Sequence, residues 1–141
     1  MLFRSRNVQI LSVPLELVNQ VWGQACPHLA RAFEYAQGDY TLQEAQVYVT
    51  SGMWQLVVAE DAEGIKGAAL IHYFNRPSNR IAFVIAMGGR LITGPDTFEQ
   101  FKCILRANGA TYIEGAARDG ILRLWAKFDV VKKYNIIGSP L

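Results

Sequence analysis

The feature that most constrains this fold is a nearly continuous apolar run, RIAFVIAM, at residues 80–87. Such a run is typical of a strand at the centre of a sheet whose two faces are both covered. A helical pattern follows at residues 95–108, with Phe98 and Phe101 on its apolar face, and a second β-rich run follows at residues 111–116. This order predicts a βαβ crossover in which the two strands are parallel neighbours.

Helices and one strand are expected before this unit. Residues 8–13 form a short β-rich run, and a helical pattern begins after Pro14. Because proline lacks an amide donor, Pro27 is expected to divide that helical region into two pieces, of which the second stops at Gly38. A T-x-x-E capping box at Thr41 and Glu44 opens another helix, which should end near Gly52.

An antiparallel hairpin is expected next. Residues 54–60 and 65–74 are β-rich runs joined by the sequence Asp-Ala-Glu-Gly, in which Gly64 can supply a positive φ. Gly88 and Gly89 are expected to end the central strand that follows. The chain therefore predicts an α/β fold with a mixed sheet.

The C-terminal part predicts one more helix and one more strand. The helix spans residues 119–128, and residues 130–137 can return as a terminal strand. The residues expected to face inward from the helix are Ile121, Leu124, Trp125 and Phe128. No repeat, linker or low-complexity tract divides the chain, so residues 1–141 are predicted to form a single domain.

Composition and charge exclude several classes of function. The 141 residues carry a formal net charge of +2 and only 18% charged side chains, which argues against nucleic acid as a partner. Two distant cysteines indicate no disulfide framework, and two histidines without ligand spacing indicate no metal site. With no signal sequence or membrane-spanning run in view, we expect a soluble intracellular protein that has no contact with a membrane.

The order strand, helix pair, antiparallel hairpin, long central strand, helix, strand, helix and strand resembles the fold of the Gcn5-related N-acetyltransferases (GNAT). Local sequence is similar to a group of short GNAT-like proteins of tailed bacteriophages. The segments that carry this similarity are GDYTL at residues 38–42, SGMWQL at residues 51–56, Gly88-Gly89, and residues 115–130. The resemblance implies a GNAT-like mixed sheet with N-terminal helices, an antiparallel hairpin and the βαβ crossover.

The resemblance also implies where a cofactor would bind. GNAT enzymes hold the pyrophosphate of coenzyme A in a turn of form Q/R-x-x-G-x-G/A that leads into the crossover helix. The turn here has different spacing, Pro95 removes an amide donor, and Asp96 and Glu99 place negative charge in the first helical turn. The residues that could form an irregular pyrophosphate turn are Met87, Gly88, Gly89 and Arg90.

Catalytic residues of the usual GNAT kind are missing. Acyl transfer from a thioester needs a group that accepts a proton and a group that donates one, and GNAT enzymes often use a glutamate of the central strand and a tyrosine of the last helix. The central strand here has no carboxylate, and Trp125 stands at the tyrosine position. Two other strand carboxylates are Glu60 and Glu114. Glu114 is the better candidate base, because the resemblance places it beside the gap where GNAT substrates enter.

Three interpretations follow. The leading one is a non-catalytic GNAT-like protein of a tailed phage that needs no cofactor, is located in the virion or the host cytoplasm, and binds copies of itself, virion components or a host protein. The alternative is an acetyl-CoA-dependent N-acetyltransferase with an irregular pyrophosphate turn. The third is a nucleic-acid-binding module that uses a C-terminal basic side. The residues of that side are Arg118, Arg123, Lys127, Lys132 and Lys133.

Overall fold

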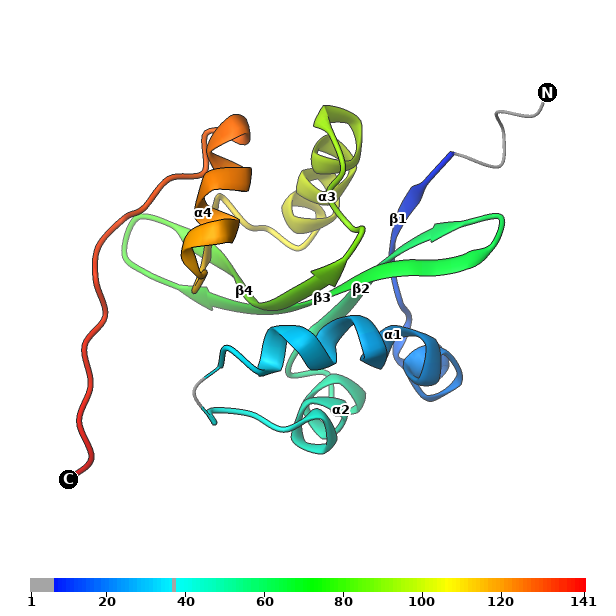
Figure 1. Ribbon diagram of the computed structural model, residues 1–141, viewed down its shortest axis with the longest axis horizontal. Coiled ribbons are helices and arrows are strands. Elements are labelled where there is room, and N and C mark those ends of the chain that lie inside the picture. The colour runs from blue at the N-terminus through cyan, green and yellow to red at the C-terminus, as the bar shows by residue number, and fades with distance from the viewer. Residues whose placement is uncertain (1–6, 37) are drawn as a thin grey trace.

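The computed structural model describes residues 7–36 and 38–141 and shows a mixed five-stranded sheet with helices on both faces (Figure 1). The strand order is β1-β2-β3-β4-β5, and only the β4–β5 pair is parallel. The elements in chain order are β1 (Gln9–Ser12), a 3-10 turn (Leu15–Leu17), α1 (Val18–Phe33), α2 (Leu42–Thr50), β2 (Gln55–Asp61), β3 (Gly64–Asn75), β4 (Arg80–Gly89), α3 (Pro95–Ala107), β5 (Tyr112–Gly115), α4 (Asp119–Trp125) and a 3-10 turn (Ala126–Phe128). The predicted fold class is confirmed, including the hairpin and the βαβ crossover.

Each face of the sheet has its own hydrophobic cluster. Helices α1 and α2 cover one face, where Trp22, Leu29 and Trp54 are buried. Helix α3 and the shorter α4 cover the other face, where Phe101 and Trp125 are buried (Figure 1). Burial on both faces explains why β4 is so uniformly apolar in sequence.

Helix α1 is continuous through Pro27, so the prediction of two helical pieces is wrong. The proline removes a hydrogen bond to the carbonyl of Gly23, four residues earlier. Gly23 and Pro27 both lie on the exposed side of the helix, where water can satisfy that carbonyl. Ala25 and Leu29 are fully buried against the sheet and hold the helix on either side of the proline.

Strand β4 continues through Gly88 and Gly89, so the prediction that they end the strand is also wrong. Gly88 pairs with Ala68 and Gly89 pairs with Gly67 on β3. A Cβ atom at position 88 would lie 1.7 Å from the carbonyl oxygen of His28 in α1. The glycines therefore let the end of β4 approach α1 more closely than any other residue would allow.

The terminal strand predicted at residues 130–137 does not form. After Asp129, whose φ is +64°, the chain runs on without regular structure (Figure 1), and its Lys133 contacts Glu114 of the edge strand β5. Ile136 and Ile137 are 78% and 92% exposed, so they find no apolar face to cover. Leu124 was predicted to face inward and is instead 44% exposed, because α4 is only seven residues long and buries Trp125 alone.

Candidate functional site

Pairing between strands β4 and β5 stops midway along β4. They pair only from Ile81 with Tyr112 to Val84 with Gly115, whereas β4 continues to Gly89 and β5 ends at Gly115. We call the resulting opening, between residues 85–89 of β4 and the chain beyond Gly115, the β4–β5 split.

A β-bulge lies at the start of this split. Leu70 of β3 pairs with Ala86 and Ile71 pairs with Val84, which leaves Ile85 as an extra residue on β4. Bulges occur often beside active sites, where they redirect the strand and interrupt its pairing. Beyond Val84, alternate backbone amides of β4 face the split, because each residue of a strand directs its polar groups to one neighbour or the other. An extended ligand that contains amide groups can pair with them, as an added strand would.

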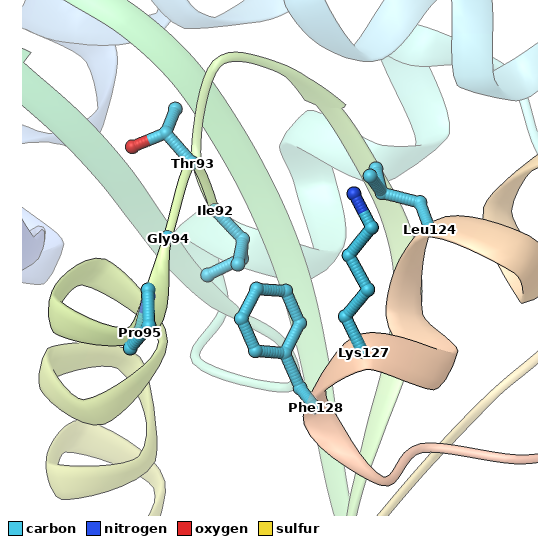
Figure 2. Close-up of a pocket in the computed structure, with 7 residues that line it drawn as sticks. All are labelled: Ile92, Thr93, Gly94, Pro95, Leu124, Lys127 and Phe128. Atoms are coloured by element: carbon cyan, nitrogen blue, oxygen red, sulfur yellow. The ribbon is translucent and has the colours of Figure 1, made fainter.

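A pocket of about 440 Å³ lies near the split on the α3 side of the sheet, between the loop before α3 and helix α4 (Figure 2). Lys127 extends along it next to Phe128 and brings the one charged side chain of the described lining. The residues that line it are Ile92, Thr93, Gly94, Pro95, Leu124, Lys127 and Phe128. A smaller hollow of about 240 Å³ shares Thr93, Gly94 and Pro95 with it. The arrangement offers an apolar surface and one ammonium group to an anionic ligand.

The amides of the loop before α3 are already used within the protein. The hydroxyl of Thr97, a residue only 5% exposed, accepts hydrogen bonds from the amides of Thr93 at 2.8 Å and Gly94 at 3.2 Å. Pro95 is the first residue of α3 and has no amide hydrogen. The amides of Asp96 and Thr97 have no acceptor within the helix, as in the first turn of any α-helix. Backbone donors for a phosphate are therefore few.

The four residues predicted to form a pyrophosphate turn lie at the far end of β4. Met87 packs against the α3-side cluster, and the amide of the exposed Arg90 donates to the carbonyl of Lys66 at 2.7 Å. Gly88 and Gly89 are pressed against His28, whose Nε2 lies 3.1 Å from the carbonyl oxygen of Ile65. Close packing thus explains the two glycines without a ligand, and a cofactor-binding role for the four residues stays a prediction.

Glu114 lies one residue before the last β4–β5 pair. Its side chain is 9% exposed and forms ion pairs with Arg76 and, at 2.5 Å, with Lys133. The hydrogen bond from Arg76, followed by that from Lys133, lowers the pKa of the Glu114 carboxyl below its ordinary value. A carboxylate held in this way is a weak proton acceptor near neutral pH, which favours a role in binding cations over the predicted role as a base.

The two faces of the sheet at the split differ in chemistry. Ile113 packs into the α3-side cluster, so its neighbours Tyr112 and Glu114 point to the opposite face. On that face Glu114 is in register with Phe83, and Phe83 with His72, whose Nδ1 is buried without a hydrogen-bond partner among the described residues. One face thus presents an apolar pocket with Lys127, and the other presents a carboxylate and aromatic rings.

Trp125 is a core residue. It is 8% exposed and packs edge-on against Phe98 with 5.6 Å between the ring centres.

Among residues 7–36 and 38–141, no group of three or more His, Cys, Asp or Glu side chains is placed to hold a metal ion. No helix of the described chain has the length and apolar character needed to cross a membrane.

Comparison with known proteins defines the fold. No protein-family model and no curated protein matches the sequence. Solved structures do match over nearly the whole chain. An aminoglycoside acetyltransferase from an uncultured soil metagenomic sample has a TM-score of 0.69 at 11% identity, with 95% of each chain covered. A predicted acetyltransferase from Clostridium acetobutylicum, solved with acetyl-CoA, has a TM-score of 0.61 at 8% identity, with 95% of this chain and 96% of that chain covered.

A third structure, a ribosomal-protein-alanine N-acetyltransferase from Brucella melitensis biovar Abortus 2308, has a TM-score of 0.58 at 11% identity and covers 96% of this chain and 98% of its own. The chain therefore has the GNAT acetyltransferase fold. At such low identity the similarity defines the fold alone. Nothing in these comparisons indicates a bacteriophage origin.

Proposed function

We propose that this chain binds an acyl-CoA, with acetyl-CoA as the simplest case, in the β4–β5 split and transfers its acyl group to an amine. The observation that carries this proposal is the split itself, with the bulge at Ile85 where β5 stops pairing. The proposal reverses the order of the first two sequence interpretations, because β4 continues beyond its last pair with β5, whereas the sequence showed only missing residues.

The chemistry of coenzyme A suits the two parts of the site. Its pantetheine arm is extended and contains two amide groups, which can pair with the free side of β4 beyond Val84. Its phosphates would lie towards the pocket that Lys127 lines and the smaller hollow beside it, where the amides of Asp96 and Thr97 are the available backbone donors. The Thr97 hydroxyl already holds two loop amides, and the Asp96 carboxylate opposes an anion. We therefore expect binding weaker than a complete pyrophosphate turn would give.

The missing proton donor does not prevent acyl transfer. A thiol has a pKa near ~8.5, so coenzyme A can leave as a thiolate without an acid at the position of Trp125. The described part of the split shows no carboxyl group with a raised pKa, so proton removal from the amine falls to water. Positioning of thioester and amine then supplies the rate enhancement.

The ion-paired Glu114 and the buried Trp125 favour a second candidate function, in which the chain binds a ligand or a protein without turnover. In that case acetyl-CoA would bind and no thiol would be released with any amine. The tailed-phage assignment belongs to this second candidate. Partners within a virion or host, and location in the virion or host cytoplasm, stay predictions.

Calorimetric titration with acetyl-CoA tests the binding step. Lys127→Gln should weaken binding on the order of tenfold, because hydrogen bonds to charged groups contribute roughly 1.5–3 kcal/mol and ~1.4 kcal/mol corresponds to tenfold. Arg123→Gln is the matched control, since Arg123 lies one turn earlier on α4 and outside the pocket lining. No heat at millimolar acetyl-CoA would end the proposal, and binding without thiol release in the presence of amines would favour the non-catalytic role.

A further inference from the structure

One amine of the protein itself already lies beside the split. The ammonium of Lys133, in the C-terminal segment of residues 129–141, contacts the Glu114 carboxylate at 2.5 Å. It also lies 4.8 Å from the ring centre of Tyr112 and 5.5 Å from that of Tyr134. A carboxylate with aromatic rings around it is a common way for proteins to bind an ammonium group.

The position of this ammonium relates it to the proposed reaction. Glu114 pairs with Phe83, one step before the last pair, Val84 with Gly115, after which β4 and β5 separate. Tyr112 and Glu114 face away from the α3 side, where the pocket with Lys127 lies. An acyl donor that enters from the α3 side and an amine held by Glu114 would therefore approach the split from opposite faces.

We propose that Glu114 and Tyr112 form an acceptor subsite for a primary ammonium, and that the chain's own Lys133 fills this subsite. The acceptor would be a primary amine at the end of a flexible chain, such as a lysine side chain in an extended peptide. The subsite rests on the proposed function for its acyl donor. Arg76 also bonds to Oε2 of Glu114, so the carboxylate keeps its position when Lys133 leaves.

The reaction requires an uncharged amine. The acceptor first gives one proton to water, and its nitrogen then attacks the thioester carbonyl carbon. The C–N bond forms as the C–S bond breaks, coenzyme A leaves as its thiolate, and the second amine proton passes to water. Lys133 occupies the contacts with Glu114 and Tyr112 that an acceptor amine would need, so it acts as an internal competitor.

The test compares full-length wild type with Lys133→Gln and the matched control Lys132→Gln, which makes the same charge change at the exposed neighbouring residue. The probe is Nα-acetyl-lysine amide, and the assay measures thiol release from acetyl-CoA. Lys133→Gln should lower the KM for the probe about fivefold, as expected for loss of a competing, partly exposed ion pair, and Lys132→Gln should leave it unchanged. Equal KM values for all three proteins would overturn the proposal.

A second measurement needs no turnover. Backbone amide chemical shifts at Tyr112, Phe83 and Gly115 should move when the probe is added to Lys133→Gln without acetyl-CoA, and should not move in Glu114→Gln/Lys133→Gln. Shifts in Lys133→Gln alone would support the subsite even if acetyl-CoA failed to bind. The failure of the subsite proposal and the failure of the proposed function can therefore be told apart. No shift in either variant, or the same shift in both, would overturn it.

Discussion

The two sides of strand β4 differ in how closely they are packed. On the side towards α1 and β3, added Cβ atoms at Gly88 and Gly89 would lie 1.7 and 2.5 Å from backbone oxygens, so no space is left. On the side towards β5, pairing stops after Val84 and the strand lies open up to Gly89. Packing therefore accounts for the glycines at the end of β4, and the ligand site that we propose lies where the neighbouring strand ends.

The largest effect is expected from filling the closed side. Gly88→Ala should destabilise the protein by more than ~4 kcal/mol or prevent folding, because the His28 carbonyl belongs to the backbone of α1 and cannot move alone. Urea unfolding measures the change. Gly94→Ala is the control, since a Cβ there meets nothing within 4 Å and its φ of −178° suits any residue, so its effect should stay within ~0.5 kcal/mol. A stable Gly88→Ala protein would show that the two sides of β4 do not differ as described.

A smaller effect is expected in the loop before α3, near the proposed phosphate end of the open side. Thr97→Val removes the acceptor for the amides of Thr93 and Gly94 and should lower the free energy of unfolding by ~1–3 kcal/mol. Thr93→Val is the control, because its hydroxyl has only a 3.5 Å contact with Thr97, and it should change stability by less than ~1 kcal/mol. The freed amides should also increase the affinity for acetyl-CoA in titration. An unchanged or reduced affinity would place the phosphates away from this loop.

The smallest effect concerns the pH dependence of stability at Glu114. Since the folded protein lowers the pKa of this carboxyl, its ion pairs stabilise the fold above the ordinary value of 4.5, and this stabilisation is lost as the pH falls through the lower folded value. At pH 7 the free energy of unfolding of the wild type should exceed that of Glu114→Gln by up to ~1 kcal/mol. The difference is small because Arg76 and Lys133 are partly exposed. Urea unfolding of both proteins should show a smaller difference in the free energy of unfolding in strong acid than at pH 7. A constant difference would exclude these ion pairs as its cause.

Local sequence signals predicted local structure correctly. Thr41 and Glu44 form both hydrogen bonds of the capping box, at 3.1 and 2.9 Å, and Gly64 has the positive φ of a hairpin turn. The wrong predictions depended on distant partners. Gly88 and Gly89 stay in a strand because β3 pairs with them, and Pro27 stays in a helix because buried neighbours hold α1 to the sheet. Propensity rules cannot anticipate either contact.

The candidate site was predictable only in part. The resemblance to GNAT enzymes predicted Glu114 near the gap, but its partners Arg76 and Lys133 lie 38 and 19 residues away along the chain. No local sequence signal predicts the bulge at Ile85. In an all-apolar run, an extra residue does not disturb any alternation of apolar and polar side chains. Lys127 was noted as part of a basic side, and only the packing of α4 against the loop before α3 brings it into a pocket.

The C-terminal segment has a consequence for the handling of this protein. Strand β5 is the last strand of the sheet, and a bare edge offers unpaired backbone groups to any other chain. Here the edge strand is only four residues long, Lys133 forms an ion pair with its Glu114, and the preceding Lys132 is exposed. Short strands and lysines are the means by which natural sheets avoid edge-to-edge aggregation. A chain shortened at residue 129 would lose both lysines and expose β5, and we expect it to aggregate where single lysine substitutions stay monodisperse.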